Sequence, residues 1–157
     1  MALSRTAWQT AITATASTAQ YTLGTLREFQ NPTYGPQIWR YVQNKRGSSV
    51  TAGLGVMQED GTDKYEVTVS GASTPNVRVL GAAQHTIADA YFGWVLADGV
   101  GLFVSDGTTT ANTPQICAAN GQFTDGTAVT SEGIVFANAT EDPAGAGGTF
   151  QGYIRAL

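Results

Sequence analysis

The chain has few of the residue types that carry most enzyme chemistry. Its 157 residues include one histidine, His85, and one cysteine, Cys117. A single cysteine excludes an internal disulfide and argues against a small secreted domain built on disulfide bonds. We expect Cys117 to be a small buried apolar side chain, because neighbouring Ile116, Ala118 and Ala119 supply no positive charge to activate a thiol.

Long apolar runs are also missing. No segment approaches the roughly 20 apolar residues that a bilayer-spanning helix needs, and the first residues lack the pattern of a signal peptide. We therefore expect a soluble protein, made in a reducing cytoplasm, with no membrane partner. The length predicts one domain with an appended arm.

Charge is sparse and unevenly distributed. Only 13% of residues are charged, and the net charge is −4. Residues 1–46 hold five basic residues against one acid, whereas residues 47–157 hold three against eleven. The two ends are expected to face different surroundings, although chance and ordinary solvation explain the same pattern. Nucleic acid is not expected as a partner, because the acidic body repels phosphate and the basic residues are scattered.

Turn signals are frequent and fairly regular. Five dipeptides pair a residue that tolerates positive φ with glycine, as hairpin turns require. These dipeptides are Asp60-Gly61, Asp98-Gly99, Asp106-Gly107, Asn120-Gly121 and Asp125-Gly126.

The segments between the turns are rich in Val, Ile, Thr, Tyr and Phe, which favour strands. We expect strands at residues 21–29, 37–42, 64–69, 76–81, 91–96, 102–104, 115–118, 133–137 and 149–154. Loops are expected at Asn31-Pro32 and Gly35-Pro36, whereas residues 50–57 are ambiguous. The fold class is therefore all-β, a compact antiparallel β-barrel or sandwich of about eight short strands.

The first twenty residues differ from the rest. They are small, rich in Ala and Thr, and carry few large apolar side chains, among them Trp8 and Ile12. We interpret residues 1–20 as an extended N-terminal arm and residues 21–157 as the β-domain. Trp8 is a natural interface anchor, although covering the domain's own core is equally consistent with the pattern.

No catalytic, metal or cofactor site is expected. His85 has no G-x-S-x-G elbow to serve, so we expect a loop histidine bonded to the backbone. The acidic cluster at residues 59–66 does not have the spacing of a calcium loop and is interpreted as a solvated hairpin tip. The pairs Gly53/Gly55 and Gly99/Gly101 lack the third glycine of a dinucleotide fingerprint.

Aromatic residues leave a carbohydrate-binding module as an alternative. Tyr34, Trp39 and Tyr41 near a Pro/Gly loop, or Tyr91 with Trp94, could form a sugar platform. Aromatic residues at this density more often belong to the core.

Two stretches of the chain resemble small structural proteins of tailed bacteriophage virions, in particular capsid-decorating or cement proteins. These stretches are residues 26–29 with 34–42, and residues 79–87, 91–95, 100–101 and 133–154. The resemblance implies a non-enzymatic β-domain on the outside of an icosahedral shell, often as a trimer. An N-terminal arm would reach across neighbouring capsid subunits, and many copies would make a modest interface effective.

We therefore expect a decoration protein on the outer capsid surface that stabilises the shell and is made in the host cytoplasm. Its partners would be the major capsid protein and sister copies in a homotrimer. The residues predicted to contact capsid or sister subunits are Arg5, Trp8, Ile12, Arg27 and Arg40. A tail, neck or fibre component of the same virion is the first alternative.

Overall fold

The computed structural model describes residues 12–59, 63–69, 79–126, 136–140, 143 and 145–156. These residues form ten strands and one short 3₁₀ turn, at residues 119–121. The strands are β1 (Leu26–Asn31), β2 (Gly35–Asn44), β3 (Gly55–Gln58), β4 (Glu66–Val69), β5 (Val79–Ala83), β6 (Phe92–Val104), β7 (Pro114–Cys117), β8 (Phe123–Asp125), β9 (Phe136–Ala139) and β10 (Thr149–Arg155). The all-β prediction is confirmed.

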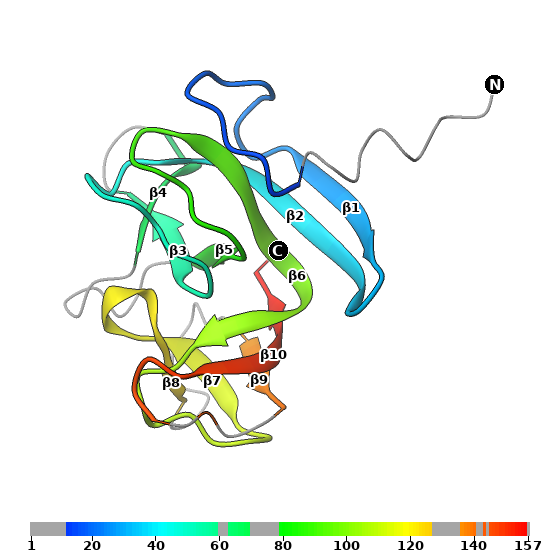
Figure 1. The fold of residues 1–157 in the computed structure, drawn as a ribbon, viewed down its shortest axis with the longest axis vertical. Helices are drawn as coiled ribbons and strands as arrows, with labels where there is room; N and C mark the ends of the chain where they lie inside the picture. Colours follow the sequence, from blue (N-terminus) through cyan, green and yellow to red (C-terminus); the bar gives the residue numbers. More distant parts are fainter. Residues whose placement is uncertain are drawn as a thin grey trace.

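The strands form one sheet that is nearly closed into a ring. Its order is β1-β2-β4-β3-β5-β6-β10-β9-β7-β8, and an additional pairing joins β2 to β6. That pairing closes β2, β4, β3, β5 and β6 into a small barrel, which with β1 forms the first lobe (Figure 1). All named strand pairs are antiparallel except the short parallel contact between β2 and β4.

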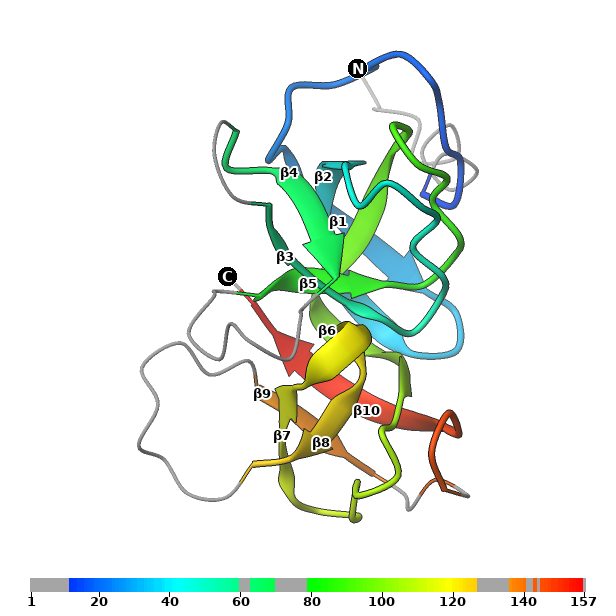
Figure 2. The same ribbon diagram turned by 90° about the vertical axis from the view of Figure 1, so that its left-hand side faces the viewer.

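The second lobe is built on the same long strand. The C-terminal half of β6 pairs with β10, and the sheet continues through β9 and β7 to β8. A parallel bridge between Ser105 and Phe123 then brings β8 back to the end of β6. Figure 2 shows the lobes one above the other, joined through β6.

Two apolar clusters fill the structure. One gathers the aliphatic side chains of the barrel: Val42, Val50, Leu54, Val56, Val67, Val69, Leu80, Ala83, Ile87 and Val95. The other contains the aromatic side chains Trp39, Tyr41 and Trp94 of the first lobe and Phe103, Phe123 and Phe150 of the second. The predicted alternation in residues 64–69 is confirmed, because Val67 and Val69 point inward.

The predicted hairpin turn at Asp98-Gly99 is wrong. β6 runs through this dipeptide for 13 residues and exchanges partners there, from β2 and β5 to β10. Gly99 has φ +121°, and a Cβ there would lie 3.0 Å from the carbonyl oxygen of Pro36. The glycine permits a bend and a close approach of β2, which a local turn signal does not distinguish from a hairpin.

Other strands begin at residues that differ from the predicted ones. Residues 21–25 precede β1, and Gly35-Pro36, expected in a loop, begins β2 and pairs with Gln30 and Asn31. Pro36 is the second residue of β2, and proline is tolerated near the start of a strand, where its missing N–H interrupts the ladder least. The strand predicted at 149–154 and the turn at Asn120-Gly121 are confirmed, since β10 spans Thr149–Arg155 and both turn residues have positive φ.

The Asn120-Gly121 turn provides a test of the fold. Gly121 (φ +74°) would place a Cβ 2.8 Å from the carbonyl oxygen of Gly55, whereas Gly47 (φ +77°) has nothing within 4 Å. Both Gly→Ala variants introduce left-handed strain of roughly 1–2 kcal/mol, but only Gly121→Ala adds overpacking, worth about 1–3 kcal/mol more. Chemical denaturation of the two variants should show this difference, and equal losses would contradict it.

Candidate interaction surfaces

The chain before β1 covers the outer face of β2 and β6 in the first lobe. Ala16 and Phe92 exchange two backbone hydrogen bonds, of 3.1 and 2.8 Å. The backbone N–H of Gln20 donates to the hydroxyl of Tyr41 at 3.1 Å. Residues 12–20, the described part of the predicted arm, therefore lie against the β-domain; the arm boundary itself stays a prediction.

An aromatic cluster lies under this segment, residues 12–24, which we call the covering segment. The ring of Tyr21 is 5.2 Å from Tyr41 and 5.3 Å from Trp94, and Tyr41 stacks on Phe92 at 6.1 Å. The guanidinium of Arg27 sits 4.3 Å above the Tyr21 ring and 4.7 Å from Trp94. Such offset and cation–π contacts fix the covering segment to the barrel.

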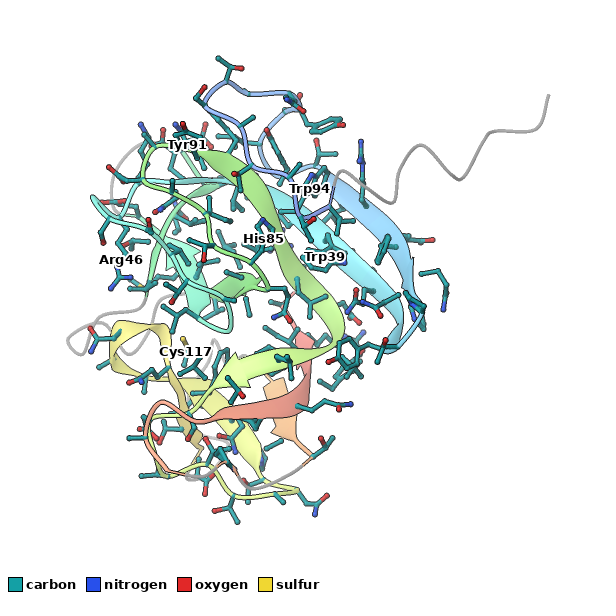
Figure 3. The ribbon with its side chains drawn as sticks, in the orientation of Figure 1. Trp39, Arg46, His85, Tyr91, Trp94 and Cys117 are labelled. Carbon is teal, nitrogen blue, oxygen red and sulfur yellow. The ribbon has the colours of Figure 1, made fainter. Side chains whose placement is uncertain are left out.

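The sugar-platform alternative fails at three of its five residues. Trp39, Tyr41 and Trp94 are at most 2% exposed, so no sugar ring can stack on them. Figure 3 shows Trp39 and Trp94 within the first lobe. Tyr91 is exposed at the end of the first lobe, and Tyr34 is half-buried in the β1–β2 hairpin. The aromatic residues belong to the core because the covering segment, which the sequence showed as a separate arm, packs over them.

The predicted interface residues are placed as follows. Arg5 and Trp8 lie outside the described residues. Ile12 is 4% exposed and packs in the aromatic cluster, and Arg27 is half-buried over its rings. Arg40 is 7% exposed and donates to the carbonyl oxygens of Leu80 and Ala156, at 2.7 and 3.0 Å. The structure thus gives Ile12 and Arg40 roles within the chain; their contact with a partner stays a prediction.

Glutamine side chains close the second edge of β6 between the lobes. The Gln84 amide donates to the carbonyl of Leu102 and accepts from its N–H, both at 2.9 Å, as a neighbouring strand would. Gln37 donates to the carbonyl of Val100 at 2.6 Å and accepts from the Trp39 indole at 3.1 Å. These side chains block the addition of a foreign strand at this edge.

A network around Asp125 closes the edge of β8. The carboxylate accepts hydrogen bonds from Thr110, Thr113 and Gln115, at 2.6–2.8 Å. Desolvation raises the pKa of Asp125, but the hydrogen bonds from Thr110, Gln115 and Thr113 outweigh it and lower this pKa to about 2. The loop from Ser105 to Thr113 is thereby held along β8.

The outward face of the second lobe combines apolar and neutralised polar groups. Leu102 and Tyr153, on adjacent strands, are 42% and 41% exposed. The Tyr153 hydroxyl donates to Asp98 at 2.7 Å, which raises the pKa of Tyr153, and Arg155 lies 3.9 Å from Asp98. The charges on this face thus have partners within the chain.

His85 does not bond to the backbone as predicted. Both ring nitrogens are buried without a hydrogen-bond partner, and burial lowers the pKa of His85. The ring lies beside Gly93 of β6, where a Cβ would lie 3.5 Å from Nε2. No local sequence feature indicates this packing.

Cys117 is half-buried rather than fully buried, and its Sγ fills the space where Gly55 would carry a Cβ.

In the acidic cluster, Glu66 pairs with Lys45 at 3.7 Å, while residues 60–62 lie outside the described part. Within the described ranges, no three His, Cys, Asp or Glu side chains are grouped for a metal ion. In that same part of the chain, no helix is long and apolar enough to span a membrane.

The Gln84 contact predicts a specific loss. Gln84→Glu would replace the amide donor with an oxygen facing the Leu102 carbonyl, which should lower the free energy of unfolding by about 1–3 kcal/mol. The amide of Leu102 should exchange with solvent faster in this variant, as measured by hydrogen exchange. Gln30→Glu, on the exposed face of β1, is the matched control and should change little; similar effects in both would refute the edge-closing role.

The Asp125 network predicts acid sensitivity. Because the folded pKa of about 2 lies below the ordinary value of 3.8, the stabilisation is present near neutral pH and is lost between about pH 5 and pH 2. After allowance for solvent screening it is worth about 1 kcal/mol. Asp125→Asn should flatten this part of the stability–pH curve, whereas Glu28→Gln should retain the slope of the parent. An unchanged slope in Asp125→Asn would contradict the assignment.

Comparison with known proteins gives a likeness in fold. No family model and no curated protein matches this chain. Among solved structures, the chain is similar to the N base of head fibre gp8.5 in bacteriophage phi29, with a TM-score of 0.56 and 14% identity. The match covers 75% of this chain and 93% of that chain. At this identity the likeness establishes a shared fold.

Proposed function

We propose that this chain is a structural protein of a phage head, displayed on the outer capsid surface, with no catalytic role. The observation that carries the proposal is the likeness to the head-fibre base, which extends over nearly all of that domain. This likeness and the sequence resemblance to decoration proteins are separate lines that agree on a phage head. The resemblance lies in residues 26–29 with 34–42, and in residues 79–87, 91–95, 100–101 and 133–154. Agreement between sequence and fold is stronger support than either alone.

The chemistry of the described residues supports a structural role. The sole histidine lies beside Gly93 with both nitrogens unpartnered, so it holds no nucleophile in hydrogen-bond reach. The sole cysteine fills space beside Gly55. The polar networks at Gln84 and Asp125 close strand edges, a use that favours a robust, non-aggregating particle component.

The partners we propose are the major capsid protein and sister copies of this chain. Arg5 and Trp8 are the favoured contact residues, because Ile12 and Arg40 are buried here and Arg27 is engaged with two aromatic rings. A basic N-terminal third against an acidic body would direct one end of the molecule toward an acidic capsid surface.

Two arrangements fit this proposal. The chain could decorate the shell in many copies, or it could serve as the base of a longer appendage. The likeness to a fibre base supports the appendage arrangement, whereas the resemblance to cement proteins supports decoration in many copies.

Copy number in purified particles tests the proposal. Quantitative mass spectrometry against the major coat protein should give tens to hundreds of copies, since a modest interface is effective through repetition. About three to a dozen copies would move the chain to the tail or neck. Its absence from particles would overturn the virion assignment, with particles from a phage lacking this gene as the background control.

A further inference from the structure

Among the strands that the structure describes, β1 is the one whose outer edge is left open. It lies at the end of the strand order, and β2 is its one partner within the described ranges (Figure 1). At the other end, β8 is covered by the loop that includes Asp106, whose N–H donates to the carbonyl of Phe123 at 2.9 Å. Outside the pairing with β2, no backbone hydrogen bond joins Leu26, Glu28 or Gln30 to any other residue that the structure describes.

The open edge carries little protection against an added strand. Natural edges are guarded by proline, lysine, bulges or inward charges. β1 has no proline or lysine, and its one cation, Arg27, lies over the rings of Tyr21 and Trp94. The exposed face shows Leu26, which is 49% exposed, Gln30, and one charge, that of Glu28.

We propose that β1 accepts residues 2–9 of a second copy of this chain as an additional parallel strand. In one register Leu3 lies beside Leu26, Arg5 beside Glu28 and Ala7 beside Gln30. An apolar pair and an opposite-charge pair then share the exposed face. The single charge of the segment meets the single outward charge of the strand, and backbone hydrogen bonds supply the rest of the affinity.

The chain's own N-terminus cannot make this pairing. With Ala7 beside Gln30, residue 8 would lie near Asn31, yet Ala16 is fixed to Phe92, which pairs with Gln43. The interval along β2 from Gly35 to Gln43 is about 26 Å, and the three strand spacings from the added strand across β1 and β2 to β6 add about 14 Å sideways, so the separation is about 30 Å. The eight residues from 8 to 16 reach at most about 28 Å when fully extended, and residues 12–13 form a turn.

The inference concerns the free chain, so it stands whether or not the protein binds a capsid. The association state of the purified full chain should be measured by sedimentation velocity at low salt across a range of concentrations. We expect a concentration-dependent oligomer that the deletion of residues 2–9 abolishes. Circular dichroism of the deletion variant should stay that of the folded domain, because Ile12 and the covering segment are retained.

Charge reversal tests the register. Arg5→Glu and Glu28→Arg should each weaken association roughly three- to tenfold, and the double variant should recover most of the loss. Leu102→Glu, on the apolar face of the second lobe, is the control and should leave association unchanged.

Three results would overturn the inference. The first is a full chain that is monomeric up to its solubility limit. The second is an oligomer that survives the deletion, and the third is an oligomer lost in Leu102→Glu but kept in both charge reversals. The last result would assign self-association to the second lobe instead.

Discussion

The bend in β6 is the constraint on which the rest of the structure depends. One strand of 13 residues serves both lobes, pairing with β2 and β5 in its first half and with β10 in its second. The bend requires glycine because neighbouring groups already occupy the side-chain positions. A Cβ at Gly99 would meet Pro36 and Gln37, and one at Gly101 would lie 2.6 Å from Leu96 and 2.7 Å from the Gln84 amide oxygen.

Bending one strand through two lobes creates edges that must be closed. The second half of β6 has β10 on one side only, and the amides of Gln37 and Gln84 take the place of a strand on the other. At the far end, Asp125 and three partners hold a loop along β8. These closures rely on the amides of Gln37 and Gln84, whose donors and acceptors are both used, and on a carboxylate that accepts several hydrogen bonds, which is what makes them stabilising. β1 stands apart because no comparable group among the described residues covers its outer edge.

The buried polar groups also explain how the chain's end is secured. Arg40 points into the barrel and donates to the carbonyl of Ala156, which joins the C-terminal residues to the first lobe. The N–H of Ala156 donates to Ala97 at 2.7 Å, so β10 is fixed at the bend of β6 as well. A guanidinium supplies donors in a fixed fork, which suits two carbonyls from distant segments. Arg40, which the sequence analysis predicted to contact a partner, thus joins two segments of its own chain.

The sequence by itself determined the fold class, several strands and one turn. Alternation identified residues 64–69, and paired positive-φ residues identified the turn at Asn120-Gly121, because both signals are local. Only the tertiary structure decided the continuity of β6 through Asp98-Gly99, the burial of Trp39 and Trp94, and the roles of Arg40 and Gln84. Each of these depends on segments more than fifteen residues away, such as β10, the C-terminus or residues 12–24. Local propensity carries no information on such contacts, because they form only when the lobes close.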